Sequence, residues 1–356
     1  MDILDYFYEL RPRNDLFYPR KLTLPDEGSF ALFGARGAGK SALILEWLNQ
    51  RKEDGWLYLD AQDPVFALED IDVALLEGYL EEEEIFTLVI DHWFEGFLER
   101  MPRARELILV SRTLPPDLSL PRYELFPLDY EEYLGFDRSP APTQSFSRFL
   151  KVGTLPALSR MPPPSVPIRL RELFYEKFDD AESRLLLILA RFQGRKVSAH
   201  QIYTSARESF RISKDWTYAT LRRFEEEKLL YLIPYKSGAG KKMILYDFLL
   251  TRYLNKRQPF PITFDALVAL ALIKHQFPFL AAAYGYILEG RSELVLPSPF
   301  ENEEGFWRRA QKEYGSFKKE GIRKVSVVTV SNRYRFEIGG IEFEALPFYE
   351  WSILNE

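Results

Sequence analysis

Residues 34–41, GARGAGKS, decide the fold of the first part of this chain. They match the pattern G-x-x-x-x-G-K-[ST] at Gly34, Gly39, Lys40 and Ser41. The apolar run SFALF comes directly before them, and ALILEWL follows Ser41. A glycine-rich loop between a strand and a helix lets successive backbone N–H groups point at phosphate oxygens. An accidental glycine turn is the alternative, but the flanking segments fit a phosphate-binding loop.

The residue types inside this loop predict that the chain binds ATP and Mg²⁺. Lys40 is expected to reach the β- and γ-phosphates, and the Ser41 hydroxyl is expected to ligate the metal ion. The residues expected to contact the nucleotide are Gly34, Ala35, Arg36, Gly37, Ala38, Gly39, Lys40, Ser41 and Ala42.

The segments around the loop predict an α/β fold with a mostly parallel sheet. Short apolar runs alternate with amphipathic segments from residue 29 to residue 128. Such alternation places helices on both faces of a parallel sheet. Strands are expected at 29–34, 56–60, 86–91, 106–112 and 123–128, and helices at 40–52 and 68–80. Residues 129–160 look helical, and we expect a P-loop ATPase domain with a small helical lid over residues 1–160.

A carboxylate at the end of a buried strand is the second part of the expected site. Asp91 ends the run TLVID and is expected to hold Mg²⁺ together with Ser41. The alternative is an ordinary strand-end aspartate that caps the next helix. His92 stands where an ATPase of this layout usually has a glutamate to orient the attacking water. A neutral His92 can do this work. Alternatively, His92 is a packing residue in a slow ATPase. Glu95, expected one helical turn on, or Asp60, at the end of the second strand, then orients the water in its place.

The next predicted strand supplies the remaining catalytic candidate. Ser111 lies at the tip of LILVSR, where a polar side chain can sense the γ-phosphate. It joins Lys40, Asp91 and His92 as a candidate catalytic residue. Arg112 and Arg122 are candidate cations for the transition state, and for each the alternative is a solvated surface residue.

Composition favours a protein of the cytoplasm and excludes several kinds of site. The 356 residues include no cysteine and three histidines, so disulfides and thiolate metal sites are excluded and a zinc site is not expected. The N-terminal segment MDILDYFYEL is acidic and does not resemble a signal peptide. The most apolar stretch, residues 266–273, is far shorter than the ~20 residues of a membrane span.

Charge divides the chain into unlike parts. Residues 1–160 carry 17 basic and 29 acidic side chains, a net charge of −12, whereas residues 180–257 carry 16 and 8, a net charge of +8. Residues 258–356 carry 11 and 13. A basic middle between acidic flanks indicates three modules and an anionic partner for the middle one.

The second half predicts two further domains. The stretch MPPPSVP, residues 161–167, is expected to be neither helix nor strand and to form a stiff linker. Three helices follow, one of them ending at Gly194 and two beginning after Ser198 and Ser213, and then a hairpin around SGAG. This pattern predicts a winged helix-turn-helix over 168–257. A mixed α/β domain is expected over 258–356, with helices at 264–276 and 301–320 before two strand segments.

Taken in order, these segments resemble a known family. The chain is similar to archaeal and bacterial AAA-type P-loop ATPases that carry a winged helix and a restriction-nuclease-like C-terminal domain. The resemblance rests on GARGAGKSAL, TLVID, LFYPRKL (16–22), YELFPLDYEEYLGF (123–136), FLKVGTLPAL (149–158), KKMILYDFLLTRYL (241–254) and FDALVALAL (264–272). It implies Mg²⁺-dependent ATP hydrolysis that drives movement of the attached domains.

Two departures from the family change what is expected. Asp91-His92 replaces the family's Asp-Glu pair, so hydrolysis is expected to be slow. The nuclease pattern of an acidic residue followed by E-x-K is not legible around Glu293. Metal-dependent phosphodiester cleavage needs clustered carboxylates, and we therefore interpret residues 258–356 as a degenerate nuclease-like domain that does not cut DNA.

The basic middle predicts a partner but leaves its kind open. The cations expected to face it are Lys214, Arg222, Arg223, Lys236, Lys241 and Lys242. In a winged helix the third helix enters the major groove and the wing contacts the backbone, but the acidic run 225–227 lies on that helix. A structural or protein-docking role is the alternative. We therefore carry a second functional hypothesis, a nucleotide-binding regulatory or adaptor protein that docks DNA or protein with little turnover.

Overall fold

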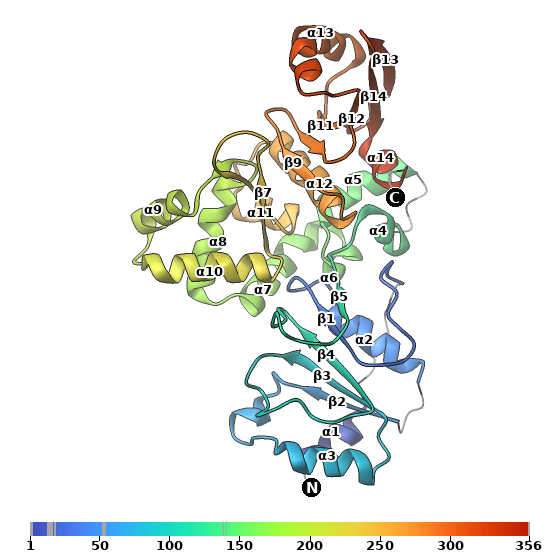
Figure 1. Ribbon diagram of the computed structural model, residues 1–356, viewed down its shortest axis with the longest axis vertical. Coiled ribbons are helices and arrows are strands. Elements are labelled where there is room, and N and C mark those ends of the chain that lie inside the picture. The colour runs from blue at the N-terminus through green and yellow to red at the C-terminus, as the bar shows by residue number, and fades with distance from the viewer. Residues whose placement is uncertain are drawn as a thin grey trace. The chain divides into compact units, whose positions relative to one another are not determined.

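The computed structural model describes residues 3–12, 17, 19–51, 55–137, 139 and 141–354. The chain divides into two compact units, Met1–Pro127 and Leu128–Glu356 (Figure 1). The finer division into domains 1–160, 168–257 and 258–356 stays a prediction. Residues Leu16 and Tyr18 of the segment 16–22, and Lys52 at the end of the expected helix 40–52, lie outside the described residues.

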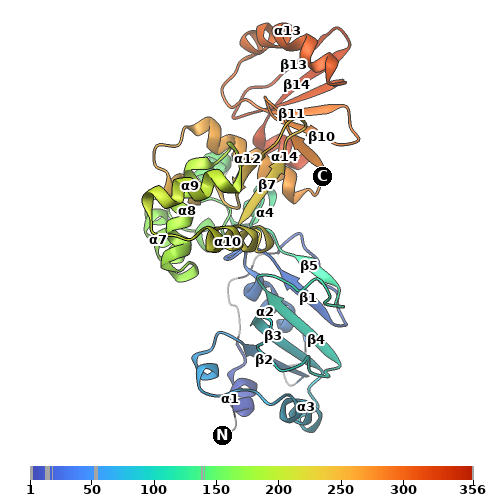
Figure 2. The ribbon, with the colours of Figure 1, turned by 60° about the vertical axis from the view of Figure 1, so that its left-hand side comes forward.

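A five-stranded parallel sheet forms the centre of the first unit, as Figure 2 shows. The strand order is β2-β3-β4-β1-β5. The strands are β1 (Phe30–Phe33), β2 (Trp56–Asp60), β3 (Thr87–Trp93), β4 (Glu106–Ser111) and β5 (Arg122–Glu124). The helices are α1 (Ile3–Leu10), α2 (Lys40–Asn49) and α3 (Val73–Glu82). The predicted parallel sheet is confirmed, and the sheet with a glycine loop after β1 is consistent with the expected P-loop NTPase core.

Burial explains why the inner strands read as continuous apolar runs. Leu57, Leu59, Leu88 and Ile90 are fully buried and pack in one cluster with side chains of α1 and α3. A parallel strand covered on both faces needs apolar residues at every position. The helix expected from residue 68 begins later, because the Asp72 carboxylate accepts hydrogen bonds from the first-turn N–H groups of α3.

The second unit begins with four helices. They are α4 (Tyr130–Phe136), α5 (Pro142–Val152), α6 (Pro156–Ser159) and α7 (Val166–Lys177). The expectation that 161–167 contains no helix was wrong, because Pro163–Ser165 form a 3-10 turn and α7 begins at Val166. Pro167 lies in the first turn of α7, where a missing backbone N–H breaks no helical hydrogen bond.

Three helices and a small antiparallel sheet follow. They are α8 (Asp180–Phe192), α9 (Ala199–Ser209), α10 (Lys214–Glu226), β6 (Lys196–Val197), β7 (Leu230–Pro234) and β8 (Lys241–Leu245). The hairpin of β7 and β8 is confirmed, and the Ser198 and Ser213 side chains cap α9 and α10 as expected. The third helix ends at Glu226 rather than residue 230, because Leu230 already begins β7.

The last part combines helices with a six-stranded sheet of order β13-β14-β12-β11-β10-β9. Phe306, Ala310 and Phe317 of one helix pack with buried strand residues such as Phe343 in a single core. The helices are α11 (Phe248–Leu254), α12 (Phe260–Lys274), α13 (Glu303–Lys319) and α14 (Phe348–Leu354). The strands are β9 (Phe279–Ala281), β10 (Tyr286–Leu288), β11 (Glu293–Pro297), β12 (Lys324–Thr329), β13 (Tyr334–Ile338) and β14 (Ile341–Pro347). No helix in the described part of the chain is long and apolar enough to cross a membrane.

Candidate nucleotide-binding site

The carboxyl ends of four parallel strands bring the predicted site residues together. The phosphate loop follows β1, and Asp60 ends β2 directly beside Asp91 of β3 in the strand register. Ser111 ends β4 opposite Trp93. Ligands of open parallel sheets bind at this edge. The residues predicted for the site therefore lie along one edge of one sheet, and their role in binding a nucleotide stays a prediction.

The phosphate loop has the backbone that its glycines predict. Gly34, Gly37 and Gly39 have φ values of 141°, 80° and 96°, which residues with a Cβ rarely adopt. A Cβ at Gly34 would lie 2.3 Å from the carbonyl oxygen of Leu125, so the loop also needs glycine there for close backbone packing. The rest of the loop is closely packed, with Ala35, Arg36 and Ala38 buried and Ala42 partly exposed at the start of α2.

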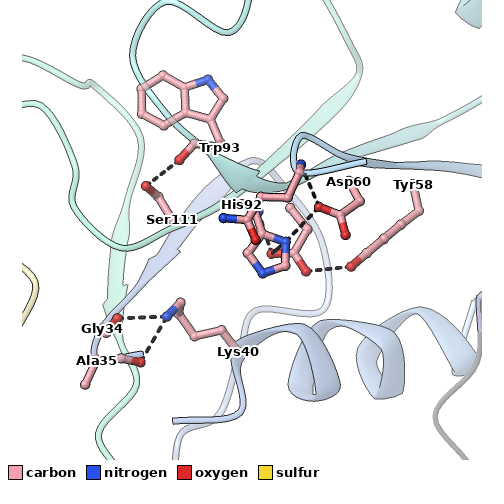
Figure 3. Close-up of polar contacts among 10 residues, drawn as sticks. Gly34, Ala35, Lys40, Tyr58, Asp60, His92, Trp93 and Ser111 are labelled. Atoms are coloured by element: carbon pink, nitrogen blue, oxygen red, sulfur yellow. Dashed lines mark hydrogen bonds and ion pairs between the residues drawn. The ribbon is translucent and has the colours of Figure 1, made fainter. Parts of the chain in front are cut away.

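Lys40 is held by the loop that it follows. Its Nζ donates hydrogen bonds to the carbonyl oxygens of Gly34 at 2.8 Å and Ala35 at 3.1 Å, as Figure 3 shows. Arg20 supports the same loop, because its guanidinium donates to the carbonyl oxygens of Ala38 and Phe126 at 2.8 and 2.6 Å. Arg20 belongs to the segment LFYPRKL, residues 16–22, but no pattern in the sequence predicted this contact.

Asp91 is fully buried and is joined to the loop through a tyrosine. Tyr58 of β2 donates its hydroxyl to Asp91 Oδ2 at 2.5 Å. Burial and the Asp91 carboxylate raise the pKa of Tyr58 well above its usual value, against a smaller opposing effect of its hydrogen bond with Ser41. Tyr58 therefore stays a donor and lies between the two residues predicted to hold Mg²⁺. No pattern in the sequence pointed to it.

His92 faces Asp60 across the ends of two strands. Its Nδ1 lies 2.7 Å from Asp60 Oδ1, and its backbone N–H donates to Asp91 Oδ1 at 2.7 Å. The register between β3 and β4 shifts between Ile90 and Trp93, and His92 has a φ of 54°. A bulge with a left-handed residue re-aims a side chain at the cost of some backbone strain. The His92 side chain is about 29% exposed, so it is only partly buried.

The other candidates lie in less suggestive positions. Ser111 is buried, and its hydroxyl donates to the carbonyl oxygen of Trp93 at 2.7 Å. Arg122 donates to the carbonyl oxygens of residues 115, 116 and 118, so it fixes a loop of its own unit. Arg112 is partly exposed at the end of β4. The helix expected after Asp91 is absent from residues 94–100, all described, so Glu95 does not lie one helical turn on.

Most cations predicted to face a partner have acidic neighbours. Arg223 pairs with Glu182 at 2.7 Å, and Lys236 pairs with Glu320 at 2.5 Å. Lys242 is buried and pairs with Asp265 at 2.8 Å, and Lys241 lies 4.0 Å from Glu225. Within the described residues, Lys214 and Arg222 remain without such a partner. The interface predicted from these six residues is thus mostly neutralised.

The loop fits a nucleotide and a hard divalent cation. Its positive-φ glycines form the backbone cradle that phosphate binding requires, with Lys40 at the start of α2. Ser41 and Asp91 would supply oxygen ligands of the kind that Mg²⁺ prefers when phosphates and water complete its shell. No cluster of three or more His, Cys, Asp or Glu suited to a metal occurs in the described ranges, and a site completed by phosphates does not require one.

Comparisons with known proteins give remote structural likenesses. No protein-family profile and no curated protein matches the chain. A Walker-type ATPase of Pyrococcus abyssi is 12% identical to this chain and has a TM-score of 0.42. The match covers 63% of this chain and 90% of the ATPase chain. A chain of Drosophila ORC bound to DNA is 12% identical, with a TM-score of 0.25, and the match covers 64% of this chain and 80% of the ORC chain. A chain from the structure of Drosophila ORC bound to AT-rich DNA and Cdc6 is 13% identical, with a TM-score of 0.21, and the match covers 65% of this chain and 87% of that chain.

Proposed function

We propose that this protein binds Mg²⁺-ATP at residues 34–42 and hydrolyses it slowly. The observation that supports this most is the convergence of Lys40, Ser41, Asp91 and His92 at one edge of a parallel sheet. A glycine loop alone accounts for phosphate binding. A buried carboxylate linked to Ser41 through Tyr58 adds a place for the metal ion.

Each residue has a role in this proposal. Lys40 exchanges its two carbonyl acceptors for phosphate oxygens, and the backbone N–H groups of the loop bind the remaining phosphate charge. Ser41 and Asp91 hold Mg²⁺, which neutralises developing charge on the phosphates when it is bound. Ser111 lies at the β4 end as the predicted γ-phosphate sensor, although its hydroxyl contacts Trp93 in this structure.

His92 orients the attacking water in place of the usual glutamate. Asp60 accepts the Nδ1 proton of a neutral His92, which fixes the tautomer and leaves Nε2 as an acceptor for a water proton. Asp60 acts through His92 and is therefore a positioning residue. A single imidazole acceptor in this position is consistent with slow turnover.

Thermal unfolding with and without Mg²⁺-ATP tests the binding step. A ligand present at ~100 times its dissociation constant adds about 2.7 kcal/mol to the free energy of unfolding. We expect this stabilisation in the wild type and none in Lys40→Ala, whose melting temperature without nucleotide should stay close to that of the wild type. Absence of stabilisation in the wild type would contradict the proposal.

The nucleotide state is proposed to change the conformation of the rest of the chain. We interpret 168–257 as a winged helix, on the three helices and the hairpin, and 258–356 as a degenerate nuclease-like domain. Plasmid DNA incubated with the protein and Mg²⁺ or Mn²⁺ should remain intact. The second candidate function, a nucleotide-binding adaptor with little turnover, is favoured by His92 in place of glutamate. Steady-state turnover of the wild type against Lys40→Ala separates the two.

A further inference from the structure

A basic cavity lies in the second unit, and no residue of the phosphate loop lines it. It has a volume of about 650 Å³ and is formed by the end of α8, the turn that follows it and the α11–α12 connection. Arg191, Arg195, Lys256 and Arg257 line it, and no acidic side chain does. The volume lies within the range of ligand-binding pockets.

These four cations are not among the six that the sequence pattern predicted to face a partner. All four are exposed, and none has an acidic partner within the part of the chain that the structure describes. Basic residues are common in the last turn of a helix, where they complement the negative end of its dipole. Arg195 and Arg257 lie beyond α8 and α11, so this effect does not account for them.

Two amide side chains leave polar atoms unused at the wall of the cavity. Gln193 is 2% exposed, and its Oε1 accepts a hydrogen bond from the backbone N–H of Leu245 at 2.9 Å. Its Nε2 has no hydrogen-bond partner among the described residues, and neither has Oε1 of Gln258. A buried donor without a partner carries a free-energy cost. Both atoms are themselves buried, so a ligand would reach them only after the side chains turn.

We propose that this cavity binds the phosphates of a single-stranded nucleic acid. The cations come from two separate segments, 191–195 and 256–257, so they suit successive phosphates better than one enclosed phosphate group. Tyr253 is partly exposed and also lines the cavity. Cations that follow a backbone and an aromatic ring on which a base stacks are the usual means of single-strand binding.

Fluorescence anisotropy of a labelled oligo(dT) 20-mer with the full chain, in the absence of nucleotide, tests this proposal. The variant Arg195→Gln/Arg257→Gln should bind at least tenfold more weakly at about 50 mM salt. The slope of log affinity against log salt should become shallower by roughly 1.4, at ~0.7 for each lost single-strand phosphate contact. Lys214→Gln/Arg222→Gln removes the same charge from α10 outside the cavity, and its affinity should stay within about twofold of wild type.

Further variants and a second ligand distinguish loss of charge from loss of folding and identify the kind of ligand. Arg195→Lys/Arg257→Lys keeps the charge and should retain most of the salt slope, and all variants should melt near the wild-type temperature. Equal losses in both glutamine variants, a loss in the α10 variant alone, or no binding by the wild type would overturn the proposal. So would stabilisation of the variant Lys40→Ala by tripolyphosphate without binding of the oligonucleotide. The oligonucleotide is tested without ATP and tripolyphosphate is tested on Lys40→Ala, so these outcomes are independent of the phosphate loop.

Discussion

At the scale of single residues, Tyr58 is the least expected part of the nucleotide site. Its hydroxyl lies between Ser41 and Asp91 and occupies a hydrogen-bonding position on the Asp91 carboxylate. In the proposed function, Mg²⁺ bound to Asp91 would have to share or replace that contact. The phenol is therefore the group with which the proposed ion would compete for the buried carboxylate.

Tyr58→Phe should destabilise the nucleotide-free protein by about 1–3 kcal/mol, the cost of a buried charged group that loses a donor. The stabilisation by Mg²⁺-ATP should grow, because the ion no longer competes with the hydroxyl. Thermal unfolding with ATP, with and without Mg²⁺, measures both effects. Tyr79→Phe is the matched control, since Tyr79 donates to Asp5 at 3.1 Å on α1. Loss of Mg²⁺-dependent stabilisation in Tyr58→Phe would show that the hydroxyl is needed by the site.

His92 and Asp60 should act as one unit in turnover. His92→Ala is expected to lower kcat at least tenfold and Asp60→Asn severalfold, with KM for ATP nearly unchanged in both. The double variant should be no slower than His92→Ala, because Asp60 works through the imidazole. Glu95→Gln, the control for the other carboxylate candidate, should keep the wild-type rate. A multiplicative loss in the double variant would contradict this coupling.

At the scale of elements, a buried carboxylate joins two segments that are far apart in the sequence. Asp247 caps α11, accepting from the Leu250 N–H at 2.6 Å, and it accepts from both the N–H and the hydroxyl of Thr154 at 2.9 and 2.5 Å. Burial raises the pKa of Asp247, while these hydrogen bonds lower it. Gly153 allows the approach, because a Cβ there would lie 2.9 Å from the Leu249 Cβ.

Thr154→Val should therefore destabilise the second unit by about 1.5–3 kcal/mol, the range for a hydrogen bond to a charged group. The change keeps the shape of the side chain and removes one donor from a buried carboxylate. Chemical denaturation measures the free energy of unfolding. Thr204→Val is the control, since the Thr204 hydroxyl is exposed and donates to the His200 carbonyl within α9. Equal effects of the two changes would refute a special role for the Asp247 contact.

The sequence predicted elements better than the contacts between them. The periodicity of apolar residues and the glycine loop were enough to predict the parallel sheet and the edge at which the candidate site residues lie. The bulge at His92 was not predictable, because it depends on how β3 pairs with β4. The start of α7 was not predictable from the prolines of 161–167, because a proline such as Pro167 also fits the first turn of a helix. Pairs such as Lys242 with Asp265 depend on tertiary packing, so a count of charges could not show which cations remain free.

At the scale of the whole molecule, the proposed function requires the two units to communicate. A nucleotide shifts a conformational equilibrium only by its difference in affinity between the two states. If nucleotide binding at the phosphate loop moves residues 128–356, it must therefore change the free energy of local opening within those residues. The adaptor hypothesis makes the same demand, whereas simple nucleotide storage in the first unit does not.

Hydrogen exchange with Mg²⁺-ATP should show this communication. Peptides that cover 34–42 and the end of β3 should become protected in the wild type, because bound phosphates fix the loop N–H groups. Peptides from 128–356 should also change their exchange, in either direction, and Lys40→Ala should abolish both effects. Changes confined to 1–127 would contradict the coupling while leaving ATP binding intact, since linkage requires a response at the second site whenever the first site biases a shared equilibrium.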